Sequence, residues 1–168
     1  MKKFSTVKLA RAGVVAGLYV SVSLLVFPIS SGAIQVRLSE ALCILPLVWA
    51  ESIPALFIGC MLSNLITGCA FFDIILGSVI TLVSAILTYF SGRIIKNTAL
   101  KIMAGGLFPV LLNAFILPLI WVWCYGAIEY MYIVQVGLLL LGQAISVYAL
   151  GTPLYFAVRK YLVKSQNI

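Results

Sequence analysis

Long apolar segments are the feature that most constrains the fold of this chain. Several runs reach the roughly 18 or more residues that a membrane-spanning helix needs. Only 9% of the 168 residues are charged, against roughly 25% in a soluble domain, and the mean hydropathy is +1.20. We therefore predict an all-α, multi-pass membrane protein that forms one domain over residues 1–168.

Six segments are candidate transmembrane helices. We predict spans at Val7–Phe27, Leu38–Trp49, Ile53–Ala70, Ile74–Ile95, Ile102–Trp123 and Tyr132–Val158. The second span is short, because twelve residues rise about 18 Å and the hydrocarbon core is roughly 30 Å thick. We expect it to extend at an end, to tilt little or to sit behind other helices. Turn-forming residues separate the spans, among them Thr67 with Gly68, Asn97 and Gly126.

The basic residues predict the orientation. Ten of the eleven lie on one side of the predicted spans, and Arg37 alone lies on the other. The ten fall in three groups: Lys2, Lys3, Lys8 and Arg11; Arg93, Lys96 and Lys101; Arg159, Lys160 and Lys164. Positive charge favours the cytoplasmic side, so both termini are predicted to be cytoplasmic, which six crossings allow. Because the charges are divided among three flanks, we expect no nucleic-acid binding.

Missing residue types exclude several kinds of chemistry. The chain has no histidine, which excludes Ser–His–Asp triads and histidine metal ligands. It has no GxxxxGK[ST] loop, so ATP hydrolysis by that route is excluded. Its four cysteines lie in or beside apolar segments without CxxC spacing, and we expect them to be packing residues. We expect no enzyme, metal or cofactor, and active transport would need an ion gradient or another polypeptide.

Polar residues near the predicted external ends of the spans are the candidate ligand contacts. A carboxylate near a membrane span is costly and usually functional, which singles out Glu40 and Asp73. Arg37 and Glu40 are three residues apart, so on a helix they share a face. They form either a mutual ion pair or a ligand site in which Glu40 accepts hydrogen bonds and Arg37 orients the ligand. Asp73 either caps its helix or faces a cavity.

Three amides and a run of small residues have two interpretations each. Asn64, Asn113 and Gln143 lie inside apolar segments, where interhelical bonding and ligand contact are both open. Ala12 and Ala16, with Gly13 and Gly17, form a small surface that suits the docking of another helix, either of this chain or of a partner.

Several motifs resemble those of one family. They are Gln35-Val-Arg37-Leu-Ser-Glu40-Ala-Leu followed by Leu45-Pro46, Gly59-Cys60-x-x-Ser63-Asn64, and Asp73 with Gly77-Ser78-x-x-Thr81-Leu82. The sequence resembles the QueT family of queuosine-precursor transporters, which are S-components of energy-coupling factor (ECF) transporters. The resemblance covers most of the chain and is densest over residues 10–90.

The resemblance implies a function and its partners. An S-component of the bacterial plasma membrane captures a scarce nutrient from outside with high affinity. It then docks on an ECF module of a transmembrane T-component and two ATPase subunits, whose ATP hydrolysis drives uptake. On this basis Ala12 and Ala16 are expected on the docking face.

The implied substrate is a 7-deazaguanine base, such as the aminomethyl precursor of queuosine. Its adjacent N–H donors suit a carboxylate, its flat ring suits an aromatic side chain, and its aminomethyl cation suits a second carboxylate. We hypothesise that Glu40 and Asp73 divide the two carboxylate roles. The amides of Asn64, Asn113 and Gln143 would read the carbonyl and ring nitrogens.

Alternative functions remain open. An S-component for another vitamin, such as riboflavin or a thiamine precursor, would use a similar pocket. A membrane-embedded lipid-modifying enzyme would need Glu40, Asp73 and Asn64 for acid–base chemistry, and a purely structural subunit would bind nothing.

Overall fold

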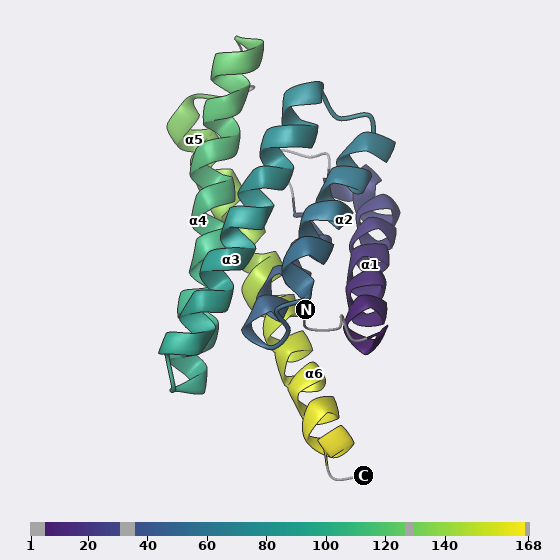
Figure 1. The fold of residues 1–168 in the computed structure, drawn as a ribbon. Helices are drawn as coiled ribbons and strands as arrows, with labels where there is room; N and C mark the ends of the chain where they lie inside the picture. Colours follow the sequence, from purple (N-terminus) through teal and green to yellow (C-terminus); the bar gives the residue numbers. More distant parts are fainter. Residues whose placement is uncertain (1–5, 31–35, 127–129, 167–168) are drawn as a thin grey trace.

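Every regular element that the structure describes is helical (Figure 1). The computed structural model describes residues 6–30, 36–126 and 130–166. The elements are α1 (Thr6–Ser30), η1 (Leu38–Leu47), α2 (Ser52–Ile66), η2 (Asp73–Gly77), α3 (Ser78–Ile94), α4 (Thr98–Tyr125), α5 (Tyr132–Ala144), η3 (Ile145–Leu150) and α6 (Gly151–Gln166). The prediction of an all-α chain is confirmed.

Four of the described helices are long and apolar enough to cross a membrane. They cover Thr6–Phe27, Asp73–Ile94, Thr98–Tyr125 and Tyr132–Leu162, and each matches one predicted span. The η2 and η3 segments are π-helical turns that continue into α3 and α6. The other two predicted spans are shorter apolar helices. Six crossings with cytoplasmic termini therefore stay a prediction.

The second predicted span is a 3-10 helix at the centre of the molecule. All side chains from residue 39 to residue 46 are buried, and η1 contacts α1, α2, α3, α4, α6 and η3. A 3-10 helix rises about 2.0 Å per residue, so ten residues extend about 20 Å, still less than a bilayer core. The segment sits behind other helices, which is one of the three arrangements that we expected.

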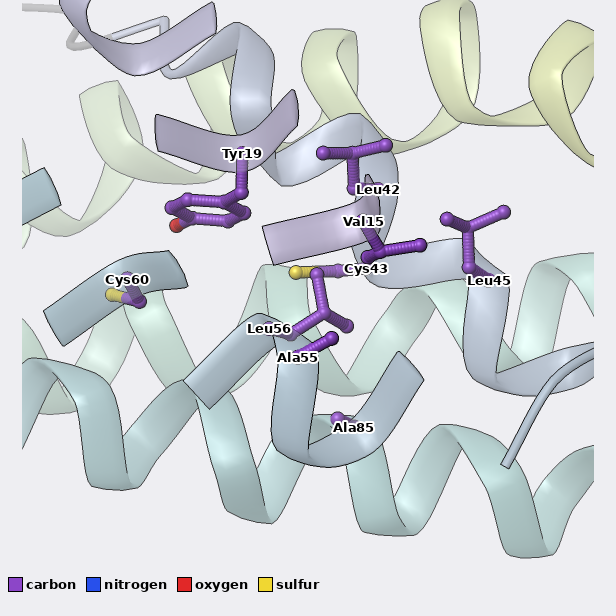
Figure 2. Packing of buried hydrophobic residues seen from close by; sticks show 9 residues of the cluster. All are labelled: Val15, Tyr19, Leu42, Cys43, Leu45, Ala55, Leu56, Cys60 and Ala85. Atoms are coloured by element: carbon purple, nitrogen blue, oxygen red, sulfur yellow. The ribbon is translucent and has the colours of Figure 1, made fainter. Parts of the chain in front are cut away.

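The surrounding helices pack in chain order. Contacts join α1 to α2, α2 to α3, α3 to α4 and α4 to α5. Helices α1 and α2 approach closely, because a Cβ at Gly59 would lie 2.8 Å from the Tyr19 Cβ and 3.2 Å from the Ala16 carbonyl oxygen. The core between them and η1 includes Val15, Tyr19 and Leu56 (Figure 2).

Local sequence signals explain where the helices end. Asn97 caps α4, because its Oδ1 accepts hydrogen bonds from the backbone N–H groups of Ala99 and Leu100. Gly126 ends α4 in the left-handed conformation, at φ 72°. Helix α2 ends at Ile66, four residues before the predicted Ala70. Gly68 adopts φ 72° there, and the Cys69 N–H bonds back to the Asn64 carbonyl at 2.9 Å, which closes a Schellman motif.

A threonine of α3 supplies the hydrogen bond that α4 lacks because of Pro109. Proline has no N–H, so the carbonyl of Gly105, four residues earlier, lacks its helical donor. The buried Thr88 hydroxyl of α3 donates to that carbonyl at 2.7 Å. A threonine on a small-residue face therefore joins α3 to α4 at the point where the proline interrupts the helical bonds.

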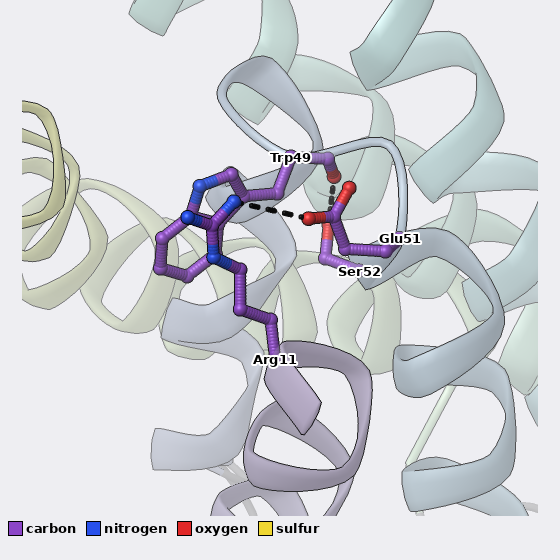
Figure 3. A network of polar contacts seen from close by, with 4 residues as sticks. All are labelled: Arg11, Trp49, Glu51 and Ser52. Atoms are coloured by element: carbon purple, nitrogen blue, oxygen red, sulfur yellow. Dashed lines mark hydrogen bonds and ion pairs between the residues drawn. The ribbon is translucent and has the colours of Figure 1, made fainter. Parts of the chain in front are cut away.

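Apart from Arg37, the described basic residues lie in segments at one end of the molecule. In Figure 1, α1 begins, α6 ends and the α3–α4 connection lies toward the same end. Arg159 of α6 donates to the Thr98 hydroxyl at 3.2 Å. Arg11 of α1 pairs with Glu51 at 3.4 Å and lies over the Trp49 ring (Figure 3). This grouping agrees with the charge argument, and the assignment of that end to the cytoplasm stays a prediction.

Candidate ligand-binding pocket

A pocket of about 290 Å³ is lined in part by the α2–α3 connection. In Figure 1 this connection lies at the end opposite the α3–α4 connection. The pocket is formed by the second half of α1, the start of η1, the end of α2, the α2–α3 connection and α4. The lining residues are Tyr19, Ser23, Val26, Phe27, Arg37, Ser39, Ser63, Asn64, Thr67, Cys69, Asp73, Gly77, Leu117 and Trp121. Three of the six predicted ligand-contact residues, Arg37, Asn64 and Asp73, are among them.

Asp73 places a carboxylate in the pocket. It opens the π-helical turn η2, and its Oδ1 accepts a hydrogen bond from the Trp121 indole N–H at 2.9 Å. The side chain caps no backbone N–H of η2, so cavity lining rather than helix capping describes Asp73. The indole holds one carboxylate oxygen and leaves the group beside the cavity, where a donor on a ligand can reach it.

Asn64 connects three parts of the pocket. Its Oδ1 accepts a hydrogen bond from Arg37 Nη2 at 3.3 Å, and its Nδ2 donates to the Asp73 carbonyl at 3.2 Å. Nδ2 also contacts Cys60 Sγ at 3.7 Å. Asn64 is buried, so its amide fixes Arg37 and the start of η2 relative to α2. Interhelical bonding and pocket lining are thus combined in one residue.

Arg37 does not share a helix face with Glu40. It precedes η1 with extended backbone (φ −86°, ψ 93°), so the three-residue helical spacing does not apply. Within the described ranges the one ion pair is Arg11–Glu51. Burial alone would lower the pKa of the Arg37 guanidinium. The nearby Tyr19, Cys60 and Glu40 side chains outweigh this effect, so the net pKa is above the usual value. A charged guanidinium therefore lines the pocket.

Glu40 lies behind the pocket. The pocket lining includes Asp73 but not Glu40, so the two carboxylates do not meet in this pocket as predicted. The Glu40 side chain is fully buried. Oε1 accepts a hydrogen bond from the Tyr19 hydroxyl at 2.7 Å, and Oε2 accepts one from Cys43 Sγ at 3.1 Å. Tyr19 does line the pocket, so Glu40 reaches the ligand space only through that ring.

Asn113 and Gln143 lie away from the pocket. Asn113 Nδ2 donates to the Pro109 carbonyl at 2.9 Å within α4. Gln143 is buried, and neither its amide nitrogen nor its oxygen has a hydrogen-bond partner among the described residues. Neither side chain lines the pocket, so the structure does not support their predicted contact with the same ligand.

Ala12 and Ala16 face the interior more than the surface. Both are half-buried and pack against the core between α1, α2 and η1. The small surface that stays open on α1 is at Gly13 and Gly17, where an added Cβ would meet no atom within 4 Å. Packing within the chain is therefore observed for the two alanines, and their role in docking a partner stays a prediction.

Sequence reasoning does not identify Tyr19 as a pocket residue. From sequence alone, an aromatic residue in an apolar run cannot be told from a lipid-facing one, although a buried tyrosine hydroxyl usually has a hydrogen-bond partner. Among the residues that the structure describes, no three potential ligands form a metal site, and all four cysteines are free thiols.

Comparison with known proteins identifies a family. The sequence profile of the family described as QueT transporter matches residues 9–160, which is most of the chain. No curated protein and no solved structure matches the chain significantly.

Proposed function

Because the chain belongs to the QueT transporter family, we propose that it is the substrate-binding S-component of an ECF-type importer in the bacterial plasma membrane. It captures a 7-deazaguanine queuosine precursor and passes it inward when a separate module of a T-component and two ATPase subunits hydrolyses ATP. The absence of a phosphate-binding loop in the sequence is consistent with a motor in other chains.

The Asp73–Trp121 pair carries the substrate assignment. The guanine-like edge of the base presents two adjacent N–H donors, and a carboxylate accepts both in a charge-assisted pair. Trp121 Nε1 holds Asp73 Oδ1 at 2.9 Å, so the orientation of the carboxylate is set before ligand arrives. The indole also offers a flat apolar surface beside the carboxylate, and nucleobases stack on such surfaces.

The carbonyl oxygen of the base lies on the same edge, next to the ring N–H, and it needs a donor of its own. Arg37 lines the same pocket and is held by Asn64 at 3.3 Å. In this arrangement Asp73 reads the donor edge and Arg37 reads the carbonyl. Glu40 positions the Tyr19 ring, and it makes no direct contact with the base.

The size of the pocket favours a small substrate. Small-molecule pockets range over about 300–1,000 Å³, so 290 Å³ suits a single small bicyclic base. Riboflavin, with three fused rings and a ribityl chain, needs more space. A thiamine precursor of one pyrimidine ring also fits, and it is the second candidate substrate.

A ligand panel tests this proposal. We expect aminomethyl-7-deazaguanine to raise the Tm of the purified protein, whereas riboflavin and a thiamine precursor do not; a ligand at 100 times its Kd stabilises by about 2.7 kcal/mol. Asp73→Asn removes a charged acceptor worth about 1.5–3 kcal/mol, which weakens binding roughly 10- to 150-fold.

The control for charge is Glu51→Gln, because Glu51 pairs with Arg11 outside the pocket. That variant should bind as the wild type does. Stabilisation by the thiamine precursor alone, or equal affinity of Asp73→Asn and wild type for the base, would overturn the assignment.

A further inference from the structure

A second cavity lies at the basic end of the bundle, apart from the ligand pocket. It is an apolar groove of about 610 Å³ on the surface of α4. The groove is lined by Ile95, Leu100, Met103, Ala104, Leu107 and Tyr148. Leu100, Met103 and Leu107 are exposed large apolar side chains, so the groove opens outward.

Tyr148 forms a fixed wall of the groove. Its hydroxyl donates to the Met103 carbonyl at 2.8 Å. Its ring lies close against α4, because a Cβ at Gly106 would lie 2.6 Å from the Tyr148 Cε1. The glycine lets the ring approach the helix closely, and the hydrogen bond anchors its polar end. The groove is thus a built feature of the α4–η3 contact.

Basic side chains border the end of the groove where α4 begins. Lys96 follows the lining residue Ile95, and Lys101 lies three residues before Ala104, which is one helical turn. Arg159 of α6 reaches the same corner through the Thr98 hydroxyl. The sequence has no acidic residue from 74 to 128 to neutralise this charge. None of these three basic side chains forms an ion pair with a described residue, so the apolar groove ends at positive charge without a carboxylate partner.

We propose that this groove binds an anionic phospholipid. One acyl chain lies along Leu100, Ala104 and Leu107, and the phosphate lies between Lys96, Lys101 and Arg159. Charge complementarity selects the occupant, because basic residues beside a bilayer attract acidic headgroups and not zwitterionic ones. The lipid joins the α3–α4 connection to α6, at a site independent of the proposed substrate pocket.

Native mass spectrometry of the detergent-purified chain tests the proposal. The probes are phosphatidylglycerol and phosphatidylcholine with identical acyl chains. We expect the wild type to retain phosphatidylglycerol in preference. Lys96→Gln and Lys101→Gln each lower its apparent affinity roughly fivefold, the effect of one basic residue near an acidic surface.

Two further variants make the result specific. Lys8→Gln removes the same charge from an exposed residue of α1 and should leave the preference unchanged. Ala104→Phe fills the groove and should remove the adducts of both lipids. Equal retention of the two lipids, an equal loss in Lys8→Gln, adducts that survive Ala104→Phe, or a dimer of this chain in place of lipid adducts would each overturn the proposal.

Discussion

Tyr19→Phe isolates the hydrogen bond that ties α1 to the central helix η1. The Tyr19 hydroxyl lies 2.7 Å from Glu40 Oε1, and the two side chains are 2% and 0% exposed. The substitution keeps the ring in the core cluster of Figure 2 and removes only the hydroxyl. Both Glu40 oxygens accept hydrogen bonds.

The expected loss of stability depends on which hydrogen-bond donors Glu40 keeps. Hydrogen bonds to charged groups contribute about 1.5–3 kcal/mol, whereas interhelical bonds in one membrane protein average about 0.6 kcal/mol. After the substitution the only described donor to the buried Glu40 is Cys43 Sγ at 3.1 Å, and a thiol is a weak donor. We therefore expect a loss of about 1.5–3 kcal/mol in the free energy of unfolding.

Unfolding by SDS in mixed micelles measures this loss. Ser23→Ala is the matched control, because Ser23 also joins α1 to η1, through a neutral bond to the Ser39 hydroxyl at 2.7 Å. It should cost about 0.6 kcal/mol. Tyr19→Phe and Glu40→Gln should couple by about 1 kcal/mol in a double-mutant cycle. Equal losses in Tyr19→Phe and Ser23→Ala, or no coupling, would refute the reasoning.

Three further substitutions test the packing and the helix ends by the same unfolding assay. Gly59→Val should destabilise by about 1–3 kcal/mol through overpacking, because its Cβ alone would lie 2.8 Å from the Tyr19 Cβ. Gly68→Ala should cost about 1–2 kcal/mol, because φ is 72° there. Arg11→Gln should cost less than about 1 kcal/mol, and the cost should shrink in high salt, because the Arg11 side chain in the Glu51 pair is 31% exposed.

Gly17→Val is the control for the first of these, because an added Cβ at Gly17 meets nothing within 4 Å. A loss at Gly17 as large as at Gly59 would mean that α1 does not pack as described. A salt-independent loss in Arg11→Gln would likewise contradict the description of an open ion pair.

The sequence predicted features that depend on local chemistry. Hydropathy located the long helices, and Asn97 and Gly126 marked the ends of α4 because their capping requirements are local. The cost of a carboxylate near a membrane pointed to Asp73, which does line the pocket. Gly68 was recognised as a breaker, but the closing bond from Cys69 to Asn64 that shortens α2 was not.

The errors come from assuming one helix geometry. Arg37 and Glu40 were placed on one face because an α-helix was assumed through both residues. Arg37 has extended backbone before the 3-10 helix, which begins at Leu38 and includes Glu40, so the α-helical spacing does not apply to this pair. Tyr19 could not be found from its own segment, because its partner Glu40 is 21 residues away and only tertiary packing brings them together.

The identity of the small molecule that copurifies with the protein tests the central claim most directly. Mass spectrometry of the denatured, freshly purified protein should find a 7-deazaguanine base near one per chain in the wild type. The same base should be strongly depleted in Asp73→Asn and retained in Glu51→Gln. A flavin or a thiamine precursor in its place, or a deazaguanine retained equally by Asp73→Asn, would contradict the account.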